Sequence, residues 1–220
     1  MTWLWLLLWI GLSSIILGAF LWSTVILFKQ KRAWEEFAQK HKLQYEPGRL
    51  MESPTVSGIM DKFGVSCFSA MRDPDDMKAR RFVSVIEVKL PDGLVGSGAA
   101  GTKDMTPFLQ SLNLLNPHIL KSEEWREEYQ YFTSDPLISE EYWTDERVKH
   151  LTAVLGVKNA DVVFMHDNKE AIIRVETTDP IQKIEKAEKV IHFLIKHAKA
   201  LLIDENQRKA IETSSTKVTD

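Results

Sequence analysis

The hydrophobic and polar residues divide the chain into an uncharged beginning and a charged remainder. Residues from Trp3 to Phe28 form 26 consecutive positions without a charged side chain. As an α-helix this run would be about 39 Å long, more than the roughly 30 Å hydrocarbon core of a bilayer. A secretory signal has a shorter apolar core with a basic stretch before it, and this chain shows neither feature. The pattern predicts a transmembrane anchor over residues 1–28.

Basic residues come directly after the uncharged run. They are Lys29, Lys31 and Arg32, whereas only Met1 and Thr2 precede the run. Because basic residues are retained on the cytoplasmic side of a membrane, we expect the N-terminus outside and the C-terminal domain in the cytoplasm. The chain would then be a single-pass membrane protein, with the lipid bilayer as one of its partners.

Small residues lie four apart within the anchor. Ser14 and Gly18 form a small-xxx-small pair, which in lipid lets a second helix approach closely. Glycine is also frequent in transmembrane helices in general. Packing against another helix and no specific packing therefore both stay open.

A different pattern begins after the anchor. Trp34, Phe37 and His41 have helical spacing, and Pro47-Gly48 is typical of a helix end, so residues 29–48 are predicted to be a juxtamembrane helix and linker. Further on, apolar and polar residues alternate, as is typical of strands. We expect strands at residues 55–60, 65–71, 81–90, 129–133, 160–165 and 171–178.

Two helices are predicted in the second half of the domain. The first lies between Thr144 as N-cap and Gly156 as its stop. The second begins at Asp179-Pro180, carries an apolar stripe and ends near Asp204.

Strands and helices without regular alternation favour an α+β domain over residues 49–203, in which a mainly antiparallel sheet with packed helices comes after the N-terminal transmembrane helix. Residues 204–220 have little apolar content and are predicted to be a disordered tail.

The overall composition does not show that the chain is divided into an uncharged run and a charged remainder. The chain has 28 Lys plus Arg, 31 Asp plus Glu and a net charge of -3, and all of these charges lie outside the uncharged run. No second uncharged run approaches the roughly 20 residues that a bilayer needs, which excludes a multi-span transporter. The single cysteine, Cys67, excludes an intramolecular disulfide. It lies in an alternating apolar run, so we interpret it as a buried small hydrophobe rather than a nucleophile.

Candidate chemistry is sparse. Gly96, Gly98 and Gly101 satisfy G-x-G-x-x-G, but Pro91-Asp92-Gly93 separates them from the preceding strand and Pro107 interrupts the helix that a nucleotide site would need after them. A dinucleotide site requires a direct strand-to-helix connection, so we interpret the segment as a mobile glycine-rich loop.

Metal ligands are equally sparse. Asp73, Asp75 and Asp76 lack the remaining ligands of a calcium loop, and no two histidines are spaced i, i+4. We expect no metal, no cofactor and no catalytic residue.

One segment is unusual in composition. Residues 122–147 hold nine acidic and two basic side chains together with six aromatic residues. Such a surface would repel nucleic acid. Trp125 and Trp143 flank its predicted strand and are candidate contacts for a basic partner. The alternative is that the aromatic rings face the core while the acidic side chains are solvated.

The order of these motifs resembles that of uncharacterised bacterial single-pass membrane-anchored proteins. The resemblance is carried by the uncharged span, the basic residues, an entry helix reading W-x-x-F-A, the H-K-L-Q-Y-E-P-G run, the V-S-G-I-M-D-K-F-G-V hairpin and a terminal helix that starts with D-P. It covers most of residues 1–203. It implies a layout only, because those proteins have no assigned active site.

These patterns favour a non-enzymatic, membrane-anchored accessory or assembly subunit that acts by contact with another membrane protein or complex. The alternative is a lipid- or small-ligand-binding domain held at the membrane, which would need an apolar cavity between the sheet and the terminal helix. An enzyme would need polar groups that converge near the glycine-rich segment.

Overall fold

The computed structural model describes residues 2–71, 82–114 and 116–217. The three loop aspartates that could chelate a cation, Asp73, Asp75 and Asp76, lie outside these described residues.

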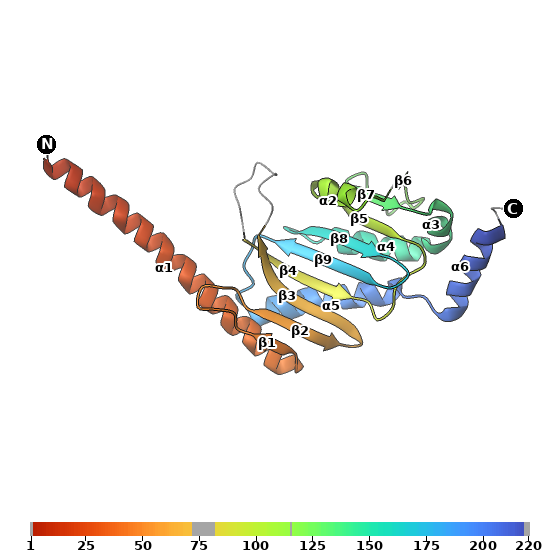
Figure 1. Ribbon diagram of the computed structural model, residues 1–220, viewed down its shortest axis with the longest axis horizontal. Coiled ribbons are helices and arrows are strands. Elements are labelled where there is room, and N and C mark those ends of the chain that lie inside the picture. The colour runs from red at the N-terminus through yellow and green to blue at the C-terminus, as the bar shows by residue number, and fades with distance from the viewer. Residues whose placement is uncertain (1, 72–81, 115, 218–220) are drawn as a thin grey trace.

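The chain begins with a long, unbroken helix, α1, which spans Thr2–His41. Figure 1 shows it projecting from the domain at one end. The predicted anchor and juxtamembrane helix are therefore continuous. The expected end at Pro47-Gly48 is wrong, because α1 stops at His41 and Lys42 adopts a left-handed conformation with φ of 57°. A short strand, β1 (Gln44–Glu46), comes next instead.

An antiparallel sheet forms the centre of the domain. Its strand order is β1-β2-β3-β4-β9-β8-β5-β7-β6, and all the pairings are antiparallel. The other strands are β2 (Thr55–Met60), β3 (Phe63–Met71), β4 (Phe82–Lys89), β5 (Gly98–Thr102), β6 (Asn116–Pro117), β7 (Tyr129–Thr133), β8 (Asp161–His166) and β9 (Ala171–Thr177). The predicted α+β class is confirmed.

Local sequence explains the first hairpin. Asp61 and Lys62 both have positive φ, 51° and 74°, and together they connect β2 to β3. Two consecutive residues with positive φ match the right-handed twist of a two-residue hairpin. The turn fixes the register in which Val56, Val65 and Cys67 all point to the main core.

Helices flank the sheet. They are η1 (Lys103–Met105), α2 (Thr106–Ser111), α3 (Pro136–Tyr142), α4 (Asp145–Leu155), α5 (Ile184–Leu201) and α6 (Glu205–Lys217). Thr144 caps α4 as predicted, by accepting from the amide of Arg147. The predicted start at Asp179-Pro180 is wrong, because α5 begins at Ile184.

The predicted disordered tail is also wrong over the residues that form α6. This helix has little apolar content, but Ile211 is buried against the main core. Arg208 also donates a hydrogen bond to the carbonyl of Gly93. The side chain of Gln207 accepts another hydrogen bond, from Arg147. Buried Ile211 and two long-range hydrogen bonds thus hold a segment that composition alone assigns to a tail.

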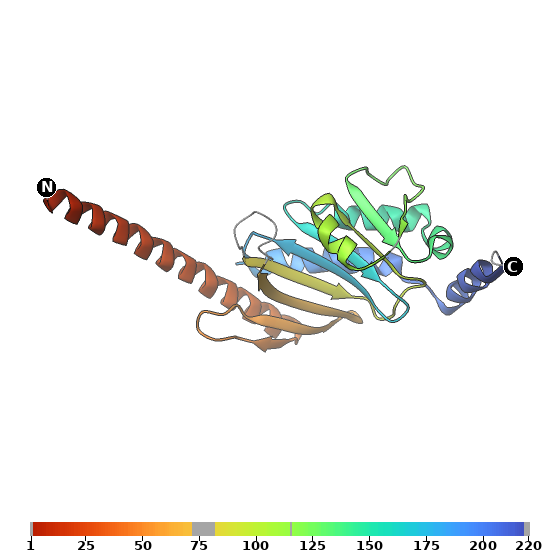
Figure 2. The same cartoon turned by 45° about the horizontal axis from the view of Figure 1, so that its top comes forward.

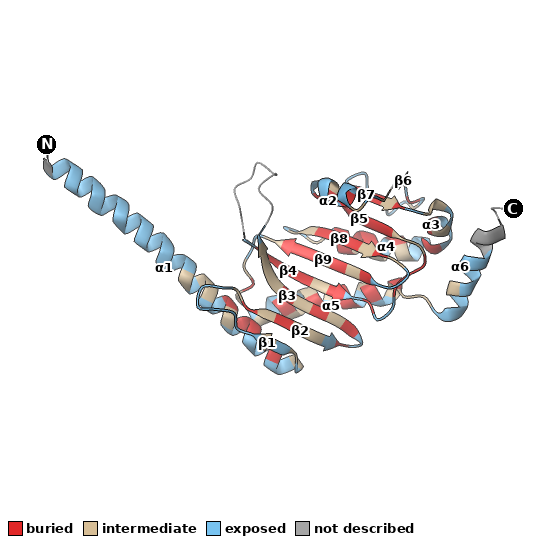
Figure 3. Cartoon of the chain, in the orientation of Figure 1, coloured by how far each residue is buried: buried red, intermediate tan, exposed pale blue. Residues whose placement is uncertain are grey.

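The two faces of the sheet are covered differently. In the main core, α4, α5 and the last turns of α1 pack on one face, and Ala100 of β5 belongs to this cluster. Its neighbour Ala99 points the other way, to a small cluster with Met105 and Leu109 around η1 and α2. Figure 2 shows α2 on the side of the sheet opposite α5. Figure 3 shows that burial concentrates in the sheet and in α5, whereas most of α1 is exposed.

Most of the glycine-rich segment is a strand rather than the predicted loop, and only Gly96, with φ of 72°, lies in the connection before it. Gly98 and Gly101 lie in β5, between β8 and β7. A Cβ atom on Gly98 would collide with the hydroxyl of Tyr131 and stand 2.7 Å from Nε2 of His166. Glycine is therefore required at position 98, because the side chains of Tyr131 and His166 pass too close to the strand to leave room for a Cβ atom.

Candidate functional site: the anchor-proximal end of the domain

Within the described part of the chain, one helix is long and apolar enough to cross a membrane. It is the helix Trp3–His41, whose most apolar 18-residue window has a mean hydropathy of 2.2 and is not buried in the fold. An exposed apolar stretch of this length is stable in lipid and costly in water. The protein therefore has the form of a single-pass, membrane-anchored domain.

The face predicted for helix packing is free in this structure. Ser14 and Gly18 are both exposed, and a Cβ atom on Gly18 would meet no other atom within 4 Å. The hydroxyl of Ser14 donates to the carbonyl of Ile10 at 2.8 Å, so its hydrogen bond is satisfied within the helix. Packing of another helix on this face stays a prediction.

The three basic residues after the anchor play different structural parts. Lys29 and Arg32 are exposed, and Arg32 pairs with Glu36 along the helix at 2.9 Å. Lys31 instead points to the domain, where its Nζ donates to the carbonyls of Arg49 and Leu50 at 2.6 and 3.4 Å. The loop between β1 and β2 is thus fixed beside the first turn after the uncharged run.

The end of α1 belongs to the core of the domain. Trp34 and Phe37 are each 1% exposed, and Gln30 is 5% exposed with its amide nitrogen 3.4 Å from the hydroxyl of Ser84 in β4. Burying a side chain as large as Phe contributes about 1.5–3 kcal/mol. The anchor and the domain are therefore one continuous body rather than two parts joined by a linker.

The last residues of α1 are held by α5. The carboxylate of Glu188 lies 2.7 Å from Nζ of Lys40 and 2.8 Å from Nε2 of His41. These hydrogen bonds hold the pKa of Glu188 below its ordinary value, because they stabilise the carboxylate form.

A cleft of about 560 Å³ lies between α1 and the start of α5. Cationic side chains from both elements line it, namely Lys29, Arg32 and Lys183. Its remaining lining comprises Ala33, Glu36, Gln182, Ile184 and Glu185. The cleft is thus a mixed polar and apolar surface immediately below the predicted span.

A buried polar cluster surrounds Gly98, where the sequence predicted only a loop. The hydroxyl of Tyr131 lies 2.9 Å from the hydroxyl of Ser139 and 3.3 Å from Nε2 of His166. Ser139 donates to the hydroxyl of Thr133 at 2.9 Å. The sequence carried a partial signal, because alternation in residues 129–133 places Tyr131 on the core face, but nothing local indicates its long-range partner His166.

This cluster favours a structural role over a catalytic one. Burial lowers the pKa of His166 to about 4 and raises the pKa of Tyr131, so both groups are neutral near pH 7. A general base works best when its pKa lies near the working pH, and a nucleophile must be reached by its substrate. Tyr131, Ser139 and His166 are all buried, with exposed fractions of 2%, 3% and 6%.

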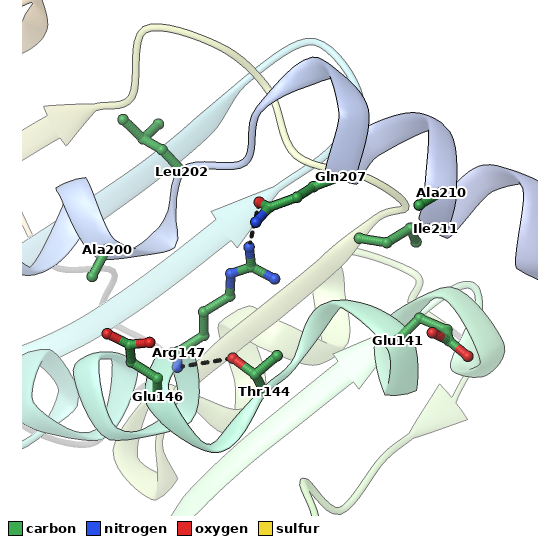
Figure 4. Close-up of a pocket in the computed structure, with 9 residues that line it drawn as sticks. All are labelled: Glu141, Thr144, Glu146, Arg147, Ala200, Leu202, Gln207, Ala210 and Ile211. Carbon is green, nitrogen blue, oxygen red and sulfur yellow. Dashed lines mark hydrogen bonds between the residues drawn. The ribbon is translucent and has the colours of Figure 1, made fainter.

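A second cleft, of about 440 Å³, lies between α6, the end of α5 and the junction of α3 with α4 (Figure 4). Arg147 crosses it, donating to the carbonyl of Tyr142 at 2.8 Å and to the side chain of Gln207 at 3.0 Å. Its guanidinium also stands over the ring of Tyr142 at 4.8 Å. Because these contacts occupy the arginine, we interpret the cleft as the junction that holds α6.

The sheet face opposite the main core carries an ionic cluster. Arg174 of β9 pairs with Glu87 at 2.8 Å and with Glu176 at 2.7 Å, and its guanidinium stands 5.6 Å from the ring centre of Phe68. We call this face, marked by exposed Ile59 and by partly buried Phe68, Glu87 and Arg174, the open sheet face. Ile59 is its most exposed apolar residue, at 74%.

The two predicted aromatic contacts differ in exposure. Trp143 is 8% exposed and packs edge-on against Tyr131, so its assignment as a partner contact is wrong. Trp125 is partly buried and packs on the ring of Tyr129. The alternative interpretation is favoured for the four rings that are buried in the core, those of Tyr129, Tyr131, Tyr142 and Trp143. A partner contact through Trp125 stays a prediction.

A reactive thiol and a metal site are the other chemical possibilities that the sequence raises. Cys67 is buried, as predicted, and burial raises the pKa of its thiol to about 12. Among the described residues, no group of three or more histidine, cysteine, aspartate or glutamate side chains could hold a metal ion.

Comparisons with known proteins add little. No family model matches the sequence, and a search of curated proteins finds no match either. Among solved structures, the chain is similar to the crystal structure of the mycobacterial trehalose monomycolate transport factor A, with 10% sequence identity and a TM-score of 0.48. The similarity covers 78% of this chain and 94% of that chain. A likeness of this size carries no argument about function.

Proposed function

We propose that the protein is a non-enzymatic, membrane-anchored accessory or assembly subunit that acts by contact with another membrane protein or complex. The observation that carries this proposal is the continuity of α1, which passes without a break from the uncharged run into the core at Trp34 and Phe37. A regular helix has a fixed rise and rotation per residue, so the domain keeps one height and one orientation at the bilayer. Such geometry suits a domain that presents a surface to a neighbour in the same membrane.

Two surfaces support the contact. Within the bilayer, Ser14 and Gly18 leave a face that a second helix can approach closely. Outside it, the open sheet face combines exposed Ile59 with half-buried Phe68 and the Arg174 ionic cluster. Aromatic residues and arginine are enriched among the residues that contribute most to protein interfaces.

The orientation is part of the proposal. Lys29, Lys31 and Arg32 come directly after the span, so we place the N-terminus outside and the domain in the cytoplasm.

Uncoupling the domain from its anchor tests the proposal. A six-residue Gly-Ser linker inserted between Phe28 and Lys29 should leave the domain folded and anchored but lose a stoichiometric partner in mild-detergent purification. The same linker added after Asp220 is the matched control and should retain the partner. Equal retention by both insertions would refute the requirement for a rigid connection, and a full-length protein that purifies alone would refute the accessory role.

A lipid- or small-ligand-binding function is the second candidate. The cleft between α1 and α5 supports it, because Lys29, Arg32 and Lys183 lie beside apolar Ala33 and Ile184 just below the span. Native mass spectrometry of the purified protein should then show one bound anionic lipid that is lost in Lys183→Glu. Retention of the lipid by that variant would refute this cleft as the site.

A further inference from the structure

Exposed apolar side chains gather at the end of the domain nearest the anchor. Outside α1, the large hydrophobic residues that are exposed in the described structure are Leu50, Met51, Ile59, Met71, Phe82, Phe108, Ile119 and Leu137. Four of these eight lie at one end of the domain, and we call them the apolar rim: Leu50, Met51, Met71 and Phe82, with exposed fractions of 71%, 52%, 55% and 70%. Figure 1 shows the loop between β1 and β2, the end of β3 and the start of β4 on the side from which α1 projects.

The height of this rim along α1 can be derived from one contact. Gln30 of α1 is hydrogen-bonded to Ser84 of β4, and Phe82 begins that strand two residues earlier. Two strand residues span about 7 Å, which equals four to five residues of a helix at about 1.5 Å each. Figures 1 and 2 show β4 and α1 running in broadly the same direction. Phe82, and Met71 paired with it, therefore lie level with residues 25–26, inside the uncharged run.

Burial along α1 gives an independent measure of the same height. Every residue from Trp3 to Ser23 is exposed, but Thr24, Ile26 and Leu27 are partly buried. The domain therefore covers the last turn of the uncharged run. A part of the domain that stands beside this turn must stand at the level of the membrane that the run crosses.

Charges beside the rim fit a lipid surface. Lys31 holds the loop by donating to the carbonyls of Arg49 and Leu50, which fixes Leu50 beside the first turn after the span. Lys29 and Arg49 are exposed. Anionic headgroups attract basic groups placed within a Debye length of the surface.

We propose that the apolar rim enters the interfacial layer of the same bilayer that α1 spans, so that the domain lies against the membrane instead of standing clear of it. Leu50, Met51, Met71 and Phe82 contact acyl chains there, while the exposed Lys29 and Arg49 contact headgroup phosphates. Interfacial binding of this kind combines buried apolar area with attraction to anionic lipid. The open sheet face stays available to a protein partner, and the inference does not depend on one.

Depth-dependent quenching tests this inference on the full-length protein. Phe82→Cys and Leu50→Cys are labelled with an environment-sensitive fluorophore, and buried Cys67 stays unlabelled in the folded protein. The matched control is Ile119→Cys. The native Ile119 side chain is 79% exposed, and it lies just after β6 at the far edge of the sheet. Each variant is reconstituted in phosphatidylcholine vesicles, with and without phosphatidylglycerol and with shallow spin-labelled lipid.

We expect lipid quenching at positions 82 and 50 to exceed that at position 119 at least twofold, and to increase when phosphatidylglycerol is present. Quenching equal to the control in both lipid compositions would overturn the inference. A blue-shifted label without lipid quenching would overturn it as well, because a second protein copy would then cover the rim. Thermal unfolding of each variant, compared with the unsubstituted chain, identifies a substitution that disturbs the fold.

Discussion

Gly98→Ala inserts a methyl group into the buried polar cluster of β5. The new Cβ atom would collide with the hydroxyl of Tyr131 and stand 2.7 Å from Nε2 of His166. Forcing an extra carbon into a packed core costs about 1–3 kcal/mol. If Tyr131 moves away, its buried hydroxyl loses Ser139 as a partner, which costs about 1–3 kcal/mol more. Gly98 has no positive φ that would penalise alanine, so the lower entropy of the unfolded chain returns about 0.4–1 kcal/mol.

These contributions combine to a net destabilisation of about 1–6 kcal/mol, with about 3 kcal/mol at the centre of the ranges. For a domain of this size, about 3 kcal/mol corresponds to a melting temperature lower by roughly 6–12 °C. The assay is thermal unfolding of the full-length protein in detergent, monitored by near-ultraviolet circular dichroism.

Two further variants make this prediction sharp. Gly64→Ala is the control, because that strand glycine would meet only Lys89, whose Cβ atom is 3.3 Å away, and we expect a change within about 1 kcal/mol. Tyr131→Phe removes the colliding hydroxyl, so the double variant with Gly98→Ala should be more stable than the sum of the single effects. Additive effects, or equal stability of the two glycine variants, would refute the packing argument.

The structure supports three other predictions. Burial lowers the pKa of His166 from 6.5 to about 4, so the unfolded state takes up the proton first, and unfolding free energy should fall by about 3 kcal/mol as pH drops from about 6.5 to about 4. His166→Gln should show a shallower fall in denaturant titrations, and an unchanged slope would contradict the assignment. A reporter fused after Asp220 should be active in the cytoplasm only, and neutral replacements of Lys29, Lys31 and Arg32 should weaken that orientation. Gly18→Leu should reduce co-purification of a partner that binds in the bilayer without changing the melting temperature of the domain, and full retention would exclude that face.

The elements with strong local patterns could be predicted from the sequence. Alternation placed β7 at residues 129–133, and Thr144 marked the start of α4, because both signals arise from neighbours in the chain. Signals failed where distant contacts decide the structure. Gly98 and Gly101 resembled a loop because the close crossing of Tyr131 and His166 is not encoded locally.

Helix boundaries show the same limit. Asp179-Pro180 has the residues of a helix start, yet α5 begins at Ile184. The helix α6 is held by Ile211, which is buried in the core, and by the hydrogen bond from Arg208 to the carbonyl of Gly93. That hydrogen bond joins residues more than a hundred positions apart in the sequence. The same limit applies to the candidate site. The basic residues after the span can be read from the sequence, but the apolar rim can be identified only from the position of β4 relative to α1, which the contact between Gln30 and Ser84 gives.

Site-specific photocrosslinking in intact membranes tests the central claim most directly. A photoreactive residue that replaces Ile59 on the open sheet face should give one discrete adduct with a membrane protein. The yield of this adduct should rise in proportion to the amount of the photoreactive chain in the membrane. The adduct should disappear when a flexible linker separates Phe28 from Lys29. An absence of protein adducts from Ile59, Phe68 and Glu87, together with purification of a monomer that carries only bound lipid, would contradict the accessory role and favour the lipid-binding alternative.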